Sequence, residues 1–238
     1  MMIAAREFNY WRFCAWTGPV FIAVFVVFWG VLGHNFPPFQ PDVPASVIAD
    51  FFRTHANNIR LGMVMAMTFA VCYCTWGLAI GKVMESIVGK DSILVELAKW
   101  GAGLTVVPLL VSTSFWLTGA FRPEALSDVT LQMFYDMAWL LIDLGYSVTS
   151  VQMFAMGVAF LNDKRETPLF PKWLAWYGIW VGFMFVAECI MPYFRSGAFA
   201  RSGILNFWIE FLIWVGWIPV VTFYTLKAIG RIEQEQQG

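Results

Sequence analysis

Three carboxylates stand inside long apolar stretches of the sequence. Asp143, Glu188 and Glu210 each interrupt an apolar run that carries no other charged residue. Inserting an ionised side chain at the centre of a membrane helix costs about 2.5 to 3.5 kcal/mol, so the presence of each of these residues needs an explanation. Buried carboxylates can hold a cation, relay a proton or act as an acid and base pair. These three residues are therefore the first candidates for a functional site.

The composition assigns the chain to the membrane class. Of 238 residues, 59% are apolar and only 13% are charged, and the mean hydropathy is +0.65. Soluble domains average about 45 to 50% apolar and about 25% charged residues. The formal net charge of −1 lacks the basic excess that nucleic-acid binding requires, so no nucleic-acid partner is expected.

Six apolar stretches are long enough to cross about 30 Å of hydrocarbon as helices. The stretches are continuous rather than alternating, which favours helices over membrane strands. The sequence therefore predicts an all-α polytopic membrane protein, with one six-helix domain over residues 1–238. The predicted spans are residues 13–33, 61–80, 100–121, 137–161, 173–193 and 204–226.

The basic residues predict the orientation of the spans. Ten of them flank one side and five flank the other, and the richer side is normally cytoplasmic. Both termini are therefore expected in the cytoplasm. The ten are Arg6, Arg12, Lys82, Lys90, Lys99, Lys164, Arg165, Lys172, Lys227 and Arg231.

The first outer connection, residues 34–60, predicts a short helix of its own. After a proline-rich turn, Val47, Ile48, Phe51 and Phe52 recur at helical spacing, and Ser46 is suited to be the N-cap. We expect an amphipathic helix that lies on the outer surface and covers the bundle.

The three carboxylates fall at a common depth when the spans alternate in direction. Asp143 and Glu210 lie six residues after the outer starts of their spans, and Glu188 lies five before the outer end of its span. At 1.5 Å per residue, all three are expected about 7 to 9 Å below the outer boundary. Polar helical stripes face protein or a water-filled cavity because lipid offers no hydrogen-bond partners. If the stripes converge, they line an outward-facing cavity.

Aromatic and polar residues share these stripes or lie next to them, and they suggest a ligand. Carboxylates beside aromatic faces suit a small amphipathic or cationic molecule through charge pairing and cation–π attraction, whereas protonated carboxylates suit a neutral polar ligand. Binding, with transport as an extension, is the leading hypothesis. The predicted ligand-binding residues are Asp143, Glu188, Glu210, Trp139, Tyr146, Trp214, Trp217 and Asn206.

Two other interpretations remain open. An intramembrane enzyme would use one carboxylate as acid and another as base, so whether the protein is an enzyme is undecided, and no catalytic residue is assigned. An accessory subunit of a membrane complex would use the acids only for packing. In that case, outer arginines would neutralise them. The predicted charge partners are Arg60, Arg122, Arg195, Arg201 and Asp136.

No metal or cofactor is expected. His34 and His55 lie in the outer connection without the spacing of a zinc or di-iron motif. Neither histidine lies in a span, which disfavours a haem held by two histidines. The expected partners are membrane lipids, an unidentified small molecule and, for the accessory interpretation, a membrane complex.

Short motifs between residues 51 and 229 give the chain a wider resemblance. They are residues 59–63, 120–124, 151–152, 163–165, 170–173 and 197–200 with Gly203, together with Asp136, Trp139 and Asp143. With these motifs the chain resembles a broad group of six-span bacterial membrane proteins that has no established activity.

The resemblance implies the fold and a bacterial inner-membrane location, but no chemistry. It also implies that Arg60, Arg122, Asp136 and Asp143 belong to the common scaffold. Members of the group usually carry a Gly-Pro-Phe-Ala-Trp-Asn-Gly motif where this chain has residues 197–203, and Glu188 and Glu210 differ from the group pattern. These departures point to a specialised function.

Overall fold

The computed structural model describes residues 2–236, and this part of the chain is helical without a strand. This confirms the predicted all-α class. The described residues contain six segments that are long and apolar enough to cross a membrane. These segments are α1 (Met2–Val24) with η1 (Phe25–Leu32), α2 (Ala45–Phe69) with α3 (Val71–Val88), α4 (Ile93–Phe121), α5 (Asp128–Gly145) with α6 (Ser147–Leu161), α7 (Lys172–Glu188) with η3 (Met191–Tyr193), and η4 (Ile204–Ile209) with α8 (Glu210–Glu235).

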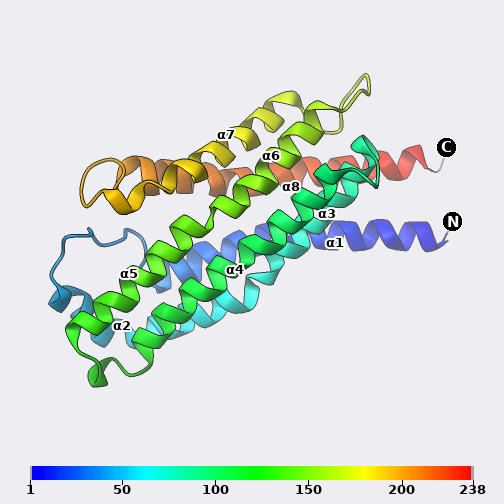
Figure 1. Ribbon diagram of the computed structural model, residues 1–238. Coiled ribbons are helices and arrows are strands. Elements are labelled where there is room, and N and C mark those ends of the chain that lie inside the picture. The colour runs from blue at the N-terminus through cyan, green and yellow to red at the C-terminus, as the bar shows by residue number, and fades with distance from the viewer. Residues whose placement is uncertain (1, 237–238) are drawn as a thin grey trace.

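Each segment packs against its neighbours in sequence, and the last packs against the first. The contacts run from α1 to α3, α4, α6, α7 and α8, and then back to α1, so the bundle is a closed ring. Both termini lie at one end of the bundle, which we call the terminal end (Figure 1). The connections before α2, before α5 and before η4 lie at the opposite end, which we call the distal end (Figure 1).

The helices extend beyond the predicted spans. The first helix begins at Met2 rather than near residue 13, and the last continues to Glu235 rather than residue 226. Neither extension contains a proline to interrupt the backbone hydrogen bonds, so each helix continues past the apolar stretch that hydropathy detects.

The predicted surface helix of the first connection is wrong as a separate element. A helix does begin there, but it starts at Ala45 after Pro44 and continues without interruption into the second span, so Ser46 is not its N-cap. No proline follows Ala45 in α2, and its first glycine is Gly62. The apolar face is covered by protein, since Ile48, Phe51 and Phe52 are buried and α2 packs against α4 and α5.

Small residues allow the helices in the centre of the ring to approach closely. A Cβ atom on Gly77 would lie 2.2 Å from the Cβ atom of Ala102, and one on Gly101 would lie 2.8 Å from the backbone nitrogen of Gln152. These contacts join α3, α4 and α6. The remaining interior is filled by large aromatic side chains, which include Trp76, Trp116 and Tyr135.

Candidate functional site

The three membrane carboxylates come together in the distal half of the bundle. Asp143, Glu188 and Glu210 are only 7%, 3% and 5% exposed, and all three line one internal space. The side chains of Glu188 and Glu210 approach one another within interaction range. We call this space and its walls the acid chamber.

Asp143 is positioned by a break in the fourth span. The helix is interrupted at Tyr146, between α5 and α6, one turn after Asp143. A Cβ atom on Gly145 would lie 2.2 Å from the Cβ atom of Pro108, so only glycine allows α4 to approach at this point. Pro108 lies inside α4, where proline removes a backbone hydrogen bond and favours a bend. The break leaves Tyr146 facing the chamber together with Asp143.

Glu188 and Glu210 lie where a regular helix ends or begins. Glu188 is the last residue of α7, and Pro192 follows within the short η3 turn. Glu210 is the first residue of α8, directly after the π-helical segment η4. Gly203 allows the chain to enter η4, because a Cβ atom there would lie 2.3 Å from the carbonyl oxygen of Ala198.

Aromatic rings enclose the carboxylates on several sides. Trp139 and Tyr146 come from the fourth span and Trp214 from α8, as predicted, and each lines the chamber. The ring centroids of Tyr146 and Trp214 are 5.6 Å apart. Trp29, from η1, adds a ring 5.6 Å from that of Trp139. The walls are therefore both acidic and aromatic.

Several polar atoms of the chamber have no hydrogen-bond partner within the described part of the chain. One buried oxygen of each of Asp143, Glu188 and Glu210 accepts no hydrogen bond. The indole N–H groups of Trp29 and Trp139 are likewise buried without an acceptor. Buried polar groups in folded proteins are nearly always paired, so these atoms are available to hydrogen-bond a ligand or water.

The predicted arginine partners do not neutralise the three acids as ion pairs. Arg60 donates to the carbonyl oxygen of Ala56 and to Oδ1 of Asn57, at 3.2 and 2.9 Å. Arg122 lies over the ring of Phe121, and Arg195 is exposed. Arg60 and Arg122 therefore contact neighbouring residues rather than the acids of the chamber, and Arg195 is exposed.

Arg201 is the arginine that enters the protein, and it pairs with Asp136. The two side chains form a 2.8 Å ion pair, and the guanidinium lies 5.0 Å from the ring centroid of Tyr135 and 6.0 Å from that of Trp139. Arg201 is close enough to act on Asp143 electrostatically. Arg201 does not line the chamber, and its guanidinium is already paired with another acid.

Most of the predicted ligand residues line the chamber, and one does not. Asn206 lines it from η4, together with Asp143, Glu188, Glu210, Trp139, Tyr146 and Trp214. Trp217 is buried elsewhere, with its ring 5.4 Å from that of Trp76 in α3. Trp217 lies about one turn deeper than Trp214, and the rotation of the helix between them turns its ring toward α3.

Sequence reasoning missed the contribution of the first span and of two phenylalanines next to Glu210. Phe25, Trp29, Phe207 and Phe211 all line the chamber. Their spacing of four residues within each pair places them on one helical face. No polar residue marks that face in the first span, so no sequence pattern linked it to the acids.

The chamber is small in this conformation. Its free space is about 20 Å³, which is enough for one water molecule. No three potential metal ligands among the described residues come together at metal-binding separations. A ligand larger than one water molecule therefore needs the walls of the chamber to move.

Two larger hollows adjoin the chamber. A distal groove of about 690 Å³, lined by residues such as Gln40, His55 and Trp208, is separated from the chamber by the ring of Phe36. That ring packs 5.7 Å from Trp29 and 4.7 Å from Phe211. The second hollow, of about 250 Å³, lies between α7 and η4 and shares Glu188 and Asn206 with the chamber.

A pair of histidines lies in the distal groove. The rings of His34 and His55 are 4.0 Å apart between centroids. Burial, together with the neighbouring His55, lowers the pKa of His34.

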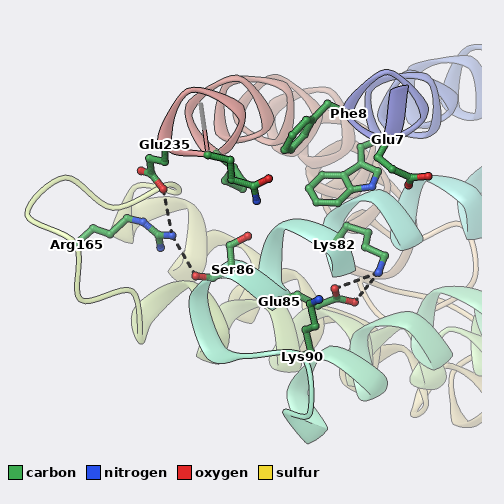
Figure 2. A pocket seen from close by; sticks show the side chains of 11 residues that line it. Glu7, Phe8, Lys82, Glu85, Ser86, Lys90, Arg165 and Glu235 are labelled. Carbon is green, nitrogen blue, oxygen red and sulfur yellow. Dashed lines mark hydrogen bonds and ion pairs between the residues drawn. The ribbon is translucent and has the colours of Figure 1, made fainter. Parts of the chain in front are cut away.

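A fourth hollow, of about 520 Å³, lies at the terminal end between α1, α3 and α8 (Figure 2). Lys82 binds Glu85, and Arg165 reaches the backbone carbonyl of Ser86 and the carboxylate of Glu235 (Figure 2). Its three basic and three acidic residues balance in charge, so it offers no strong preference for a charged ligand. No residue predicted for the site lies in it.

Comparison with protein-family models, with curated proteins and with solved structures finds no match to this chain.

Proposed function

We propose that this multi-pass membrane protein binds a small organic cation, an amine with an apolar part, in the acid chamber. The observation that carries the proposal is the set of three buried carboxylates, each with an unpaired oxygen, enclosed by aromatic rings. Six apolar helices are what a multi-pass membrane protein requires.

The negative charge of the chamber favours a cationic ligand. A buried ion without a partner costs several kcal/mol, and the guanidinium that acts on Asp143, that of Arg201, is already paired with Asp136. Either protons or a bound cation must therefore compensate the acids. Binding of a cation would release protons from the chamber, which couples occupancy to pH.

The aromatic walls favour an organic cation over a bare inorganic ion. An ammonium group is attracted to the faces of tryptophan and tyrosine rings, by up to about 2 kcal/mol or more when water is excluded. Its alkyl or aryl part can also pack against Phe25 and Phe211, which line the same space. Because the free space holds one water molecule, we expect the ligand to be enclosed by a movement of Phe36 or of η4.

We further propose that the protein belongs to the six-span bacterial group and lies in the inner membrane, surrounded by lipid, with both termini in the cytoplasm. The charge bias and the position of both termini at one end support this orientation. The distal end then faces outward, and the chamber lies nearer the outer surface than the cytoplasmic one. Transport would need a second opening toward the terminal end, and gradient-dependent uptake into proteoliposomes tests for it.

The direct test is ligand-induced thermal stabilisation of the purified protein in lipid nanodiscs. The probe is 2-phenylethylammonium, and its neutral counterpart is 2-phenylethanol. We expect the ammonium compound to raise the Tm of the wild-type protein and the alcohol to have no such effect. Glu210→Gln should weaken binding about tenfold or more, because a buried charge loses its partner.

A matched control is Glu124→Gln, which removes an exposed carboxylate at the same end of the protein. It should bind like the wild type. Glu188→Gln is a second chamber variant in case Glu210→Gln fails to fold, as judged by gel filtration. Equal stabilisation by the amine and the alcohol, or unchanged binding in a folded chamber variant, would overturn the proposal. Recovery of chemically unchanged amine distinguishes binding from catalysis.

A further inference from the structure

The hollow between α7 and η4, which we call the lateral cleft, opens on the side of the bundle rather than at its end. Trp180, Met184 and Ala187 line it from α7, and Phe199 and Leu205 line it from the chain around η4. Trp180 and Ala187 are exposed on the outside of the bundle, where lipid surrounds a membrane helix. The cleft is therefore an apolar recess of about 250 Å³ that faces the hydrocarbon.

The inner wall of the lateral cleft is the acid chamber itself. Glu188 and Asn206 line both spaces, and Glu188 is 3% exposed with one oxygen unpaired. Among the described residues that line the cleft, these two carry a carboxylate and an amide, and they lie at its deep end. An apolar entrance that leads to an unpaired carboxylate is complementary to a molecule with a long apolar tail and a cationic head.

The distal groove is a poorer route for the same ligand. It shares no lining residue with the chamber, and the ring of Phe36 packs between the two against Trp29 and Phe211. Its lining also includes Gln40 and Ser202, which form a 2.6 Å hydrogen bond across it. Entry from water would have to displace both contacts.

We infer that the ligand is a lipophilic amine that enters sideways from the membrane, with its ammonium group at Glu188 and its hydrocarbon tail between α7 and η4. The inference rests on the proposed function and names the class of ligand and its route. Such an amine first partitions into the bilayer through its apolar tail. The cleft then receives the tail at the depth where the chamber receives the head.

The test compares a long and a short amine on a variant that fills the cleft. Ala187→Trp places an indole in the lateral cleft at an exposed position, so folding should be preserved. Dodecylammonium should bind about tenfold or more weakly to this variant, because the indole occupies the space of the tail and so keeps the ammonium group away from Glu188. Binding of 2-phenylethylammonium should remain within about twofold, because the short ligand needs the chamber more than the cleft.

The control variant is Val186→Trp, the neighbouring lipid-exposed position that does not line the cleft. It should bind both amines like the wild type, and dodecanol should bind weakly to all variants. Equal binding of dodecylammonium to Ala187→Trp and Val186→Trp would overturn the lateral route. Should the Ala187→Trp protein not fold, the labelling experiment below decides the same question.

Photolabelling gives an independent reading of the route. Dodecylammonium with a diazirine at the tail end is added to proteoliposomes that contain the protein, and the sample is irradiated. Peptide mass spectrometry then identifies the labelled residues. Labels on Met184 or Leu205 support the lateral cleft. Labels on Pro37 or Trp208 would instead place the tail in the distal groove and overturn the inference.

The two proposals fail in different ways. If 2-phenylethylammonium binds in a manner that needs Glu210, while tail length and Ala187→Trp have no effect, the chamber stands and the lateral route is wrong. If the short amine does not bind to the wild type at all, the proposed function itself is wrong.

Discussion

Among single residues, Arg201 shows how the tertiary structure distributes charge. It is the buried arginine at the distal end, and it takes Asp136 as its ion-pair partner rather than an acid of the chamber. Asp136 is half exposed, so this pair can be formed without removing both charges from water. The chamber acids, which are fully enclosed, are left without that compensation and are therefore available to a ligand.

Replacing Arg201 should destabilise the protein. Arg201→Ala loses the ion pair with Asp136 and the contact with the Tyr135 ring, and we expect a loss of about 1 to 3 kcal/mol in the free energy of unfolding. The measurement is the Tm in nanodiscs. Arg195→Ala, an exposed arginine in the same connection, is the control and should change stability by less than about 0.5 kcal/mol. Equal Tm values for the two variants would contradict the role given to Arg201.

Asp163 organises the connection between α6 and α7. Its Oδ2 accepts a hydrogen bond from the backbone N–H of Leu169 at 2.8 Å, and its Oδ1 accepts from the guanidinium of Arg165 at 3.0 Å. Burial disfavours the charged form, but these backbone and arginine donors outweigh it and lower the pKa of Asp163 below its usual value. The ionised carboxylate is therefore the form that stabilises the connection.

The stabilisation by Asp163 should depend on pH. A carboxyl whose pKa is lowered on folding contributes stability above its unfolded pKa of about 4 and loses it as the pH falls through the folded value. Asp163→Asn should cost about 1 to 3 kcal/mol near pH 7, and its difference from the wild type should shrink below about pH 4. Tm measured across pH checks this. Glu166→Gln, exposed in the same connection, should show no such difference.

At the scale of elements, irregular backbone surrounds the acid chamber. The π-helical segments η1 and η4, the break between α5 and α6 and the end of α7 all contribute residues to its walls. Segments of π-helix occur often at functional sites. A regular helix is held by its own hydrogen bonds, so these interruptions are the places where the walls can rearrange around a ligand.

The continuity of α2 can be tested with proline. Asn58 lies on an exposed face midway along α2, between the part that was expected to be a surface helix and the membrane part. Asn58→Pro should cost about 3 kcal/mol or more, because it removes a backbone hydrogen bond inside a continuous helix. Asn58→Ala should be nearly neutral. A proline variant as stable as the alanine variant would show that α2 consists of two separate helices.

At the scale of the whole molecule, the ring of six spans determines which residues can meet. The closure of the last segment on the first brings η1 next to α8, so Trp29 and Phe25 join a chamber whose acids come from the last three spans. The same arrangement leaves the lateral cleft between α7 and η4. The acid chamber and the lateral cleft beside it are therefore formed by the ring as a whole rather than by any single helix.

The proposed orientation predicts which cysteines are accessible from outside the cell. With the four native cysteines replaced, Arg195→Cys should react with a membrane-impermeant maleimide in intact cells, whereas Lys90→Cys should react only after permeabilisation. Both positions are exposed, one at each end of the bundle. The reverse labelling pattern would show that the protein has the opposite orientation in the membrane and that the chamber lies near the cytoplasm.

The sequence by itself determined the all-α class and the six apolar segments that are long enough to cross a membrane, and it predicted a common depth for Asp143, Glu188 and Glu210. These follow from hydropathy and from a fixed rise per residue, which act along each helix separately. Only the tertiary structure decided that Trp29 faces the acids, that Trp217 faces α3 and that Arg201 binds Asp136. The rotation of each helix and the path of each connection depend on packing between residues that are distant in the sequence. Hydropathy contains no information about that packing.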